Sequence, residues 1–235
     1  MPKTTYGDVL ELACAFAVAF AAVILVNTPS FHYVSAALAV YLGLLVGIPL
    51  ASCKLRRRTI SKEFGLRDST SFPWWWFAMA LVLPLPFIFV LWKPSLAPTV
   101  AFAVVVAPFC EELFFRGYIA GRLRGLGIIT ASLTSALLFG AFHLGAQQFD
   151  NPGAVLVLVL LGLVYAPLFL LTDSVYVTAG AHEAWNLFLY FVSIFPSNAF
   201  GYVSYAALGL LTMGNVFLAL LEILHAQRKA ALPEA

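Results

Sequence analysis

Eight long apolar segments follow one another along almost the whole chain, and they constrain its fold more than any other feature. They cover roughly residues 8–27, 33–52, 73–92, 98–121, 128–148, 153–172, 174–195 and 199–225. A helix needs about 20 residues to cross a bilayer core of about 30 Å. Of the 235 residues, 62% are hydrophobic and only 10% are charged, whereas soluble domains are about a quarter charged. These features exclude a soluble enzyme, a nucleic-acid-binding module and a disordered regulator, and they predict a polytopic membrane protein.

The apolar segments are expected to be helices. In lipid, only helices and closed barrels satisfy every backbone polar group. Barrel strands would appear as short alternating segments, whereas these segments are continuous mixtures of Gly, Ala, Leu and Val. No linker long enough to separate two domains interrupts them. The sequence therefore predicts an all-α fold, in which residues 1–235 form a single bundle of about eight transmembrane helices with no nucleic-acid partner.

The positions of Lys and Arg predict the orientation of this bundle. With eight spans, eleven basic residues fall on one side of the membrane and only Lys93 falls on the other, while Arg116 lies inside a span. Basic loops remain in the cytoplasm, so we expect a multi-pass protein of the cell membrane with both termini cytoplasmic. The basic stretch 54–72 is either a short helix on the anionic inner leaflet or a charged loop that sets topology.

Ionisable and polar side chains are concentrated in three of the spans. They are Glu111, Glu112 and Arg116 in span 98–121, His143 in span 128–148, and His182, Glu183 and Asn186 in span 174–195. Such groups are costly inside a membrane and are functional candidates by default. Taken singly, a Glu–Arg pair is equally well a structural clamp, and a lone histidine is more often an interhelical hydrogen bond. Together, they favour one site.

The spacing of these residues orders them on their helices. Glu112 and Arg116 are four residues apart, so they share a helix face in the order that favours an ion pair. Glu111 is rotated about 100° from Glu112 and presents its carboxylate elsewhere. His182 and Asn186, also four residues apart, point in one direction. A buried carboxylate acts as a base only if a positive partner keeps it ionised, and one arginine beside two glutamates allows this.

Such groups suit hydrolysis by an activated water molecule. A carboxylate and an imidazole can share the activation of water, while a second imidazole and an amide can donate hydrogen bonds to an oxyanion. No Ser, Thr or Cys is placed as a nucleophile by this pattern, and Cys110 points about 100° away from its neighbour Glu111. Hydrolysis of a peptide bond within the membrane is the favoured function. The alternative is a non-enzymatic scaffold, or a small transporter that uses the cluster as a proton or ion path.

Three motifs in residues 107–186 resemble those of the CAAX protease and bacteriocin-processing (CPBP, or Abi) family of intramembrane glutamic endopeptidases, which includes type II CAAX prenyl endopeptidases. The EExxxR motif is matched by Glu111 to Arg116, FxxxH by Phe139 to His143, and HxxxN by His182 to Asn186. Their order and separation also agree. The motif-bearing core is therefore residues 98–195, whereas the first three spans and the last resemble the family only in hydropathy.

The resemblance implies a role for each motif residue. Glu111 and His143 would activate the water, His182 and Asn186 would form the oxyanion site, and Glu112 and Arg116 would support Glu111. Two histidines and a carboxylate could in principle bind zinc, but the chain lacks an HExxH arrangement, and we favour a mechanism without cofactor or metal. The implied partners are the lipid bilayer and a membrane-anchored peptide or protein, processed at a CAAX-type tail, leader or sorting tail. Oligomeric state does not follow from the sequence.

Overall fold

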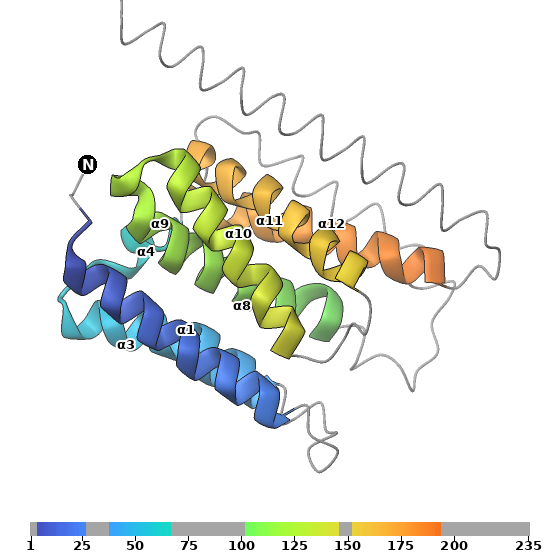
Figure 1. Cartoon of the computed structure of the whole chain (residues 1–235), viewed down its shortest axis with the longest axis horizontal. Helices are drawn as coiled ribbons and strands as arrows, with labels where there is room; N and C mark the ends of the chain where they lie inside the picture. Colours follow the sequence, from blue (N-terminus) through green and yellow to red (C-terminus); the bar gives the residue numbers. More distant parts are fainter. Residues whose placement is uncertain (1–3, 27–37, 67–101, 146–151, 194–235) are drawn as a thin grey trace, which may run out of the picture.

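The structure is a computed structural model that describes residues 4–26, 38–66, 102–145 and 152–193. Within these ranges every regular element is a helix (Figure 1), so the all-α prediction is confirmed there. Six of the eight expected spans fall largely in these ranges and are helical. The expected spans 73–92 and 199–225, and with them the count of eight, lie outside the described residues.

The first two helical stretches run side by side. Helix α1 covers Tyr6–Val26, and the second stretch contains the π-helix η2, Tyr41–Val46, and helix α3, Gly47–Leu55. Figure 1 shows α1 and α3 along one another at one side of the molecule, with the short helix α4, Ile60–Glu63, following α3. Both stretches are long and apolar enough to cross a membrane, over Tyr6–Leu25 and Leu38–Leu55.

The central stretch changes its winding several times. It begins with the π-helix η4, Phe102–Val106, and continues as α8, Ala107–Glu112, and a second π-helix, η5, Leu113–Ala120. Helix α9, Gly121–Leu123, and the 3₁₀ turn η6, Arg124–Leu126, end it. All eight residues of η5 are buried. π-Helical turns are rare and often lie at functional sites, and this one directly follows Glu111 and Glu112.

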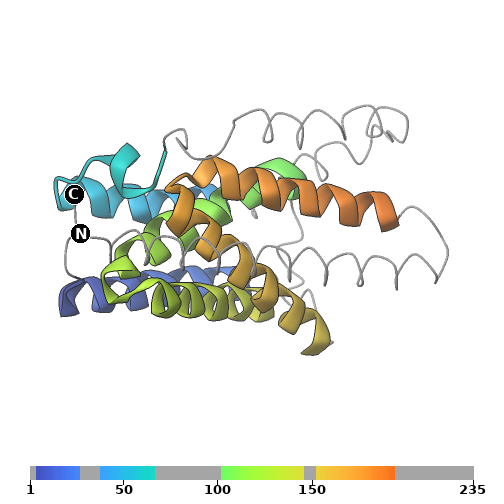
Figure 2. The same ribbon diagram turned by 90° about the horizontal axis from the view of Figure 1, so that it is seen from above.

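Three long helices complete the described fold. They are α10, Ile128–Gly145, α11, Pro152–Thr172, and α12, Val175–Ser193. Helix α10 packs against α1 and, more extensively, against α11, and Figure 2 shows α11 crossing the molecule from the side of α10 to the start of α12. Glycine allows α10 and α11 to approach closely: a Cβ atom on Gly162 would lie 2.7 Å from Cα of Ala136. Small residues at such contacts are typical of helix packing in membranes.

Helix α10 has an apolar face on the outside of the bundle and an aromatic face towards the core. Its exposed residues Ile129, Leu133 and Leu137 recur every four positions and form one stripe, as expected of a surface that faces lipid. On the opposite face, the ring of Phe139 packs edge-on against Phe115 of η5, with ring centroids 5.3 Å apart. Aromatic pairs prefer this geometry. The core therefore lies between α10 and the central stretch, beside the polar residues.

The turn that follows helix α4 is more buried than the sequence indicates, whereas α4 itself has no buried residue. Among residues 56–66 only the four residues of α4 are helical, and Phe64 is fully buried against Tyr118 and the backbone of Gly117. Phe64 is thus a core residue rather than a contact with the membrane surface. Gly65 adopts a φ of +61°, which glycine tolerates without strain, and this turn brings the chain against Asp173.

Candidate active site

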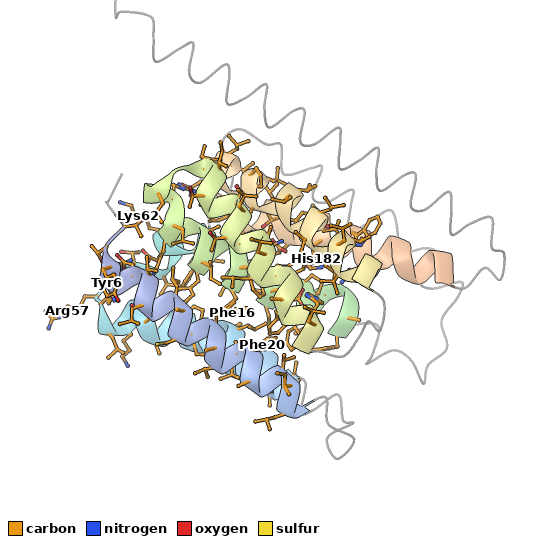
Figure 3. All side chains as sticks on the ribbon, viewed as in Figure 1. Tyr6, Phe16, Phe20, Arg57, Lys62 and His182 are labelled. Atoms are coloured by element: carbon orange, nitrogen blue, oxygen red, sulfur yellow. The ribbon has the colours of Figure 1, made fainter. Side chains whose placement is uncertain are left out.

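Four separate elements bring the site together. Glu111 and Glu112 end helix α8, Arg116 lies in η5, His143 lies near the end of α10, and His182 is on α12. His182 lies among the helices in Figure 3. All five side chains are buried. Five of the seven sequence-predicted residues therefore converge on one place, and η2 adds a sixth residue, Tyr41, that the motifs do not contain.

The carboxylate of Glu111 is at the centre of this cluster. The hydroxyl of Tyr41 donates a hydrogen bond to its Oε1 atom at 2.9 Å. Nε2 of His143 lies 3.8 Å from Oε1, and Nε2 of His182 lies 3.8 Å from Oε2. A separation of 3.8 Å is too long for a direct hydrogen bond. It leaves each imidazole close enough to share a small molecule such as water with the carboxylate.

The tautomer of His143 follows from its backbone contact. Its Nδ1–H donates to the carbonyl oxygen of Phe139 at 2.9 Å, one helical turn earlier. In a neutral imidazole, a proton on Nδ1 leaves Nε2 as an acceptor. The acceptor nitrogen of His143 and the oxygen Oε1 of Glu111 therefore face each other. Both can accept a proton, which is the arrangement that general-base catalysis requires.

Glu112 connects Arg116 to His182. Its Oε2 atom lies 3.0 Å from Nε of Arg116, and this is the ion pair that the four-residue spacing predicts. The pair is electrostatic rather than a well-directed hydrogen bond, because neither atom meets hydrogen-bond geometry with a described residue. The other carboxylate oxygen, Oε1, accepts Nδ1–H of His182 at 2.9 Å. Glu112 therefore fixes the orientation of the His182 ring, as a carboxylate that accepts Nδ1–H of a histidine commonly does.

The ring of Phe139 gives the FxxxH pattern a physical reason. The guanidinium carbon of Arg116 lies 4.4 Å from its centroid, a cation–π contact. The rings of His143 and His182 lie 4.6 Å and 5.7 Å from the same centroid. One aromatic side chain thus contacts the guanidinium of Arg116 and both imidazoles of the cluster.

His182 is the side chain that contacts both glutamates of the cluster. Its Nε2 atom lies 3.8 Å from Oε2 of Glu111, and its Nδ1 atom lies 2.9 Å from Oε1 of Glu112. Buried charges are tolerated only when they are compensated, and Arg116 supplies one positive charge to this cluster.

Asn186 and Glu183 occupy other parts of α12. The amide of Asn186 donates to the carbonyl oxygen of Ala103 in η4 at 2.9 Å, so its described contact is with the backbone rather than with Glu111. An Asn amide has two N–H groups, and one remains for another acceptor. Glu183 is buried, and its Oε2 atom has no hydrogen-bond partner among the described residues. The structure does not place Glu183 against Glu111 or His143.

Sequence reasoning missed Tyr41 because nothing in the sequence around it marks it. It lies in an apolar stretch of span 33–52, where an interfacial or core tyrosine is common. The helix packing alone brings its hydroxyl to Glu111. A second omission lies at the start of α1, where Glu11 forms an ion pair with Arg122 and accepts a hydrogen bond from Ser52.

The described residues contain no group of three or more His, Cys, Asp and Glu side chains with the geometry of a metal site. Two imidazoles and one carboxylate nevertheless face each other at Glu111.

Cys110 and Cys53 are buried, as expected of inert thiols, whereas Cys14 is exposed. None of the three lies in a described disulfide.

Buried glutamate and histidine side chains among apolar helices are the arrangement expected of a hydrolase that acts within the membrane. Residues 69–188 match the model of the type II CAAX prenyl endopeptidase Rce1-like family. The chain belongs to this family and is therefore a membrane protein and a protease of the CAAX type. No curated protein and no solved structure matches the chain.

Proposed function

We propose that the protein hydrolyses a peptide bond in a membrane-anchored protein by means of a water molecule that Glu111 and His143 activate. The position of Glu111 carries the proposal: its carboxylate lies 3.8 Å from both imidazoles and accepts a hydrogen bond from Tyr41. A water molecule between Glu111 and His143 would be within hydrogen-bond reach of two proton acceptors.

The proposed reaction uses each group once. The water oxygen attacks the carbonyl carbon, and the water proton passes to the Glu111–His143 pair. The carbonyl oxygen becomes an oxyanion, which accepts hydrogen bonds from Nε2–H of a protonated His182 and from the free N–H of Asn186. The stored proton then moves to the amide nitrogen as the C–N bond breaks. The products are a carboxylic acid and an amine, which exchange a proton to become a carboxylate and an ammonium group, and the Glu111–His143 pair returns to its starting state.

Glu112 and Arg116 act indirectly in this scheme. Glu112 accepts Nδ1–H of His182 and so orients its ring, while Arg116 pairs with Glu112. The carboxyl-terminal tail of a membrane-anchored, prenylated protein is the substrate class that the family implies. Because the site lies among apolar helices, a lipid anchor would hold the scissile bond near Glu111.

Cleavage of a fluorogenic prenylated peptide by the purified protein tests the proposal. Glu111→Gln and His143→Ala should each lower kcat by at least about a hundredfold, the usual contribution of a general base. Glu183→Gln is the matched control, because it removes another buried glutamate from the neighbouring helix, and it should retain activity. Full activity of Glu111→Gln would refute the mechanism. Proton-coupled uptake in vesicles without peptidase activity would instead support a transporter.

The proposed mechanism uses no metal ion. Elemental analysis of the active protein, together with activity after dialysis against a chelator, tests this point. We expect activity to persist without a stoichiometric metal. Zinc that is present at one ion per chain, and is lost together with activity, would assign His143, His182 and Glu111 as ligands instead.

A further inference from the structure

A charged pocket lies at one end of the bundle and shares no lining residue with the site around Glu111. The proposed function gives this pocket no role. Its volume is about 550 Å³, which is in the range of small-molecule sites. It is formed where α1 begins and where the α3–α4 connection, α9, η6 and the end of α11 meet. Five basic residues line it: Arg57, Arg58, Lys62, Arg122 and Arg124.

The acidic residues of the pocket are already engaged. Asp8 pairs with Arg58 at 3.1 Å, and Glu63 pairs with Arg58 at 2.5 Å and with Arg122 at 2.8 Å. Asp173 pairs with Arg124 at 2.8 Å. Five basic and three acidic side chains leave a formal charge of +2 on the lining.

Arg57 and Lys62 carry this excess charge. Both side chains are exposed, and neither forms an ion pair with a described residue. Figure 3 shows Arg57 extending outward at the same end of the molecule as Lys62, so both stand at the rim. Arg122 is different, because its side chain is only 2% exposed and forms part of the inner wall.

The backbone around the pocket is strained. Among the described residues, only Arg57 and Asp173 combine a positive φ with a side chain, at +52° and +54°, and both line this pocket. Left-handed conformations of such residues cost free energy and tend to persist at functional positions. One of the two strained residues, Arg57, is thus also one of the two that carry the excess positive charge.

We propose that this pocket binds the phosphate group of an anionic lipid headgroup. The pocket lies at the ends of the helices, and this end carries the basic residues that orient a protein towards the anionic cytoplasmic leaflet. A singly charged phosphodiester would be held by Arg57 and Lys62 at the rim, above the paired arginines. The buried ring of Phe169 supplies an apolar wall. The proposal is independent of the protease mechanism.

Lipid binding by the purified full-length chain in neutral detergent tests the proposal. The probes are phosphatidylglycerol, phosphatidylcholine and inorganic phosphate, and the readouts are lipid retention in native mass spectra and the thermal midpoint. Phosphatidylglycerol should bind saturably, with an apparent Kd that rises at least about tenfold in the double variant Arg57→Gln/Lys62→Gln, because two charge-assisted contacts are lost. Lys54→Gln, an exposed charge outside the pocket, should bind like the wild type.

The possible outcomes separate the sources of the phosphate. Equal binding of zwitterionic phosphatidylcholine, or an equal loss in Lys54→Gln, would overturn the proposal. Saturation by inorganic phosphate without binding of phosphatidylglycerol would overturn the lipid assignment. The double variant should melt like the wild type without lipid, since both side chains are exposed. If it does not, the two single variants provide the same comparison.

Discussion

At the scale of single residues, the site depends on contacts between side chains that are far apart in the sequence. Tyr41 and Glu111 are 70 positions apart, and so are Glu112 and His182. Each of these contacts gives one glutamate a fixed orientation. Glu111 faces the two imidazoles, whereas Glu112 faces Arg116 and His182. Adjacent residues of the same type thus have different environments, which is the usual way in which two carboxylates acquire different roles.

Tyr41→Phe tests whether the tyrosine positions Glu111. Removal of a hydrogen bond to a charged group costs about 1.5–3 kcal/mol, so we expect kcat for the fluorogenic peptide to fall about ten- to a hundredfold with KM nearly unchanged. Tyr118→Phe is the matched control, since it removes a 2.8 Å hydrogen bond to Glu11 outside the site. Equal falls in kcat for the two variants would show that Tyr41 has only a structural role.

Phe139→Leu tests the aromatic contact with Arg116. Leucine preserves an apolar side chain but removes the ring face that contacts the guanidinium and both imidazoles. We expect kcat to fall by about tenfold, which corresponds to a loss of about 1.4 kcal/mol within the usual range of cation–π energies. Phe169→Leu, in the core but away from Glu111, should change stability without this effect on kcat.

At the scale of elements, close helix packing brings the motifs together. The length and composition of the apolar segments predict which spans are helical, and the four-residue spacing places Glu112 with Arg116 on one face. The sequence does not predict the π-helical winding of Leu113–Ala120, nor the contact in which Ser135 of α10 donates to the carbonyl oxygen of Phe115 at 2.8 Å within it. The burial of Phe64 and of Arg122 is not predicted by the sequence either, because both side chains are buried only when other helices pack on them.

Gly162→Leu tests the contact between α10 and α11. Its Cβ atom would lie 2.7 Å from Cα of Ala136, and backbone atoms cannot move aside cheaply. Overpacking of this kind costs about 1–3 kcal/mol, so the thermal midpoint in detergent should fall. Gly43→Leu is the control, because a Cβ atom there meets nothing within 4 Å. A midpoint unchanged by Gly162→Leu would show that the two helices do not depend on this approach.

At the scale of the whole molecule, two polar networks join the described helices. One surrounds Glu111, and the other connects α1, α3, α4 and α9 near the basic end. In the second network, Arg122 pairs with Glu63 and Glu11 and lies 4.5 Å from the ring of Tyr118. Arg122→Gln removes a buried cation that pairs with both Glu11 and Glu63, and leaves these carboxylates with Arg56 and Arg58 as their remaining partners. Removal of one member of a buried pair costs about 3–5 kcal/mol.

Chemical unfolding in detergent should therefore show a large loss of stability for Arg122→Gln, with little change for the exposed Lys54→Gln. A small loss in Arg122→Gln would mean that water replaces the arginine at this end of the bundle.

Reporter fusions test the orientation of the whole chain. Lys and Arg are concentrated on one side of the predicted spans, so we expect both termini in the cytoplasm. Alkaline phosphatase fused to either end should be inactive, and a fluorescent protein should be bright. Active phosphatase at the carboxyl terminus would require an odd number of spans.

The sequence by itself determined that the chain forms apolar helices and identified the polar residues of the site. Charged groups are costly in lipid, so the few that occur within apolar spans stand out in composition and spacing. The tertiary structure alone decided that Tyr41 supports Glu111, that Phe139 contacts Arg116 and both imidazoles, and that Arg122 is buried. These contacts depend on how helices from distant parts of the chain pack, and no local pattern records that packing.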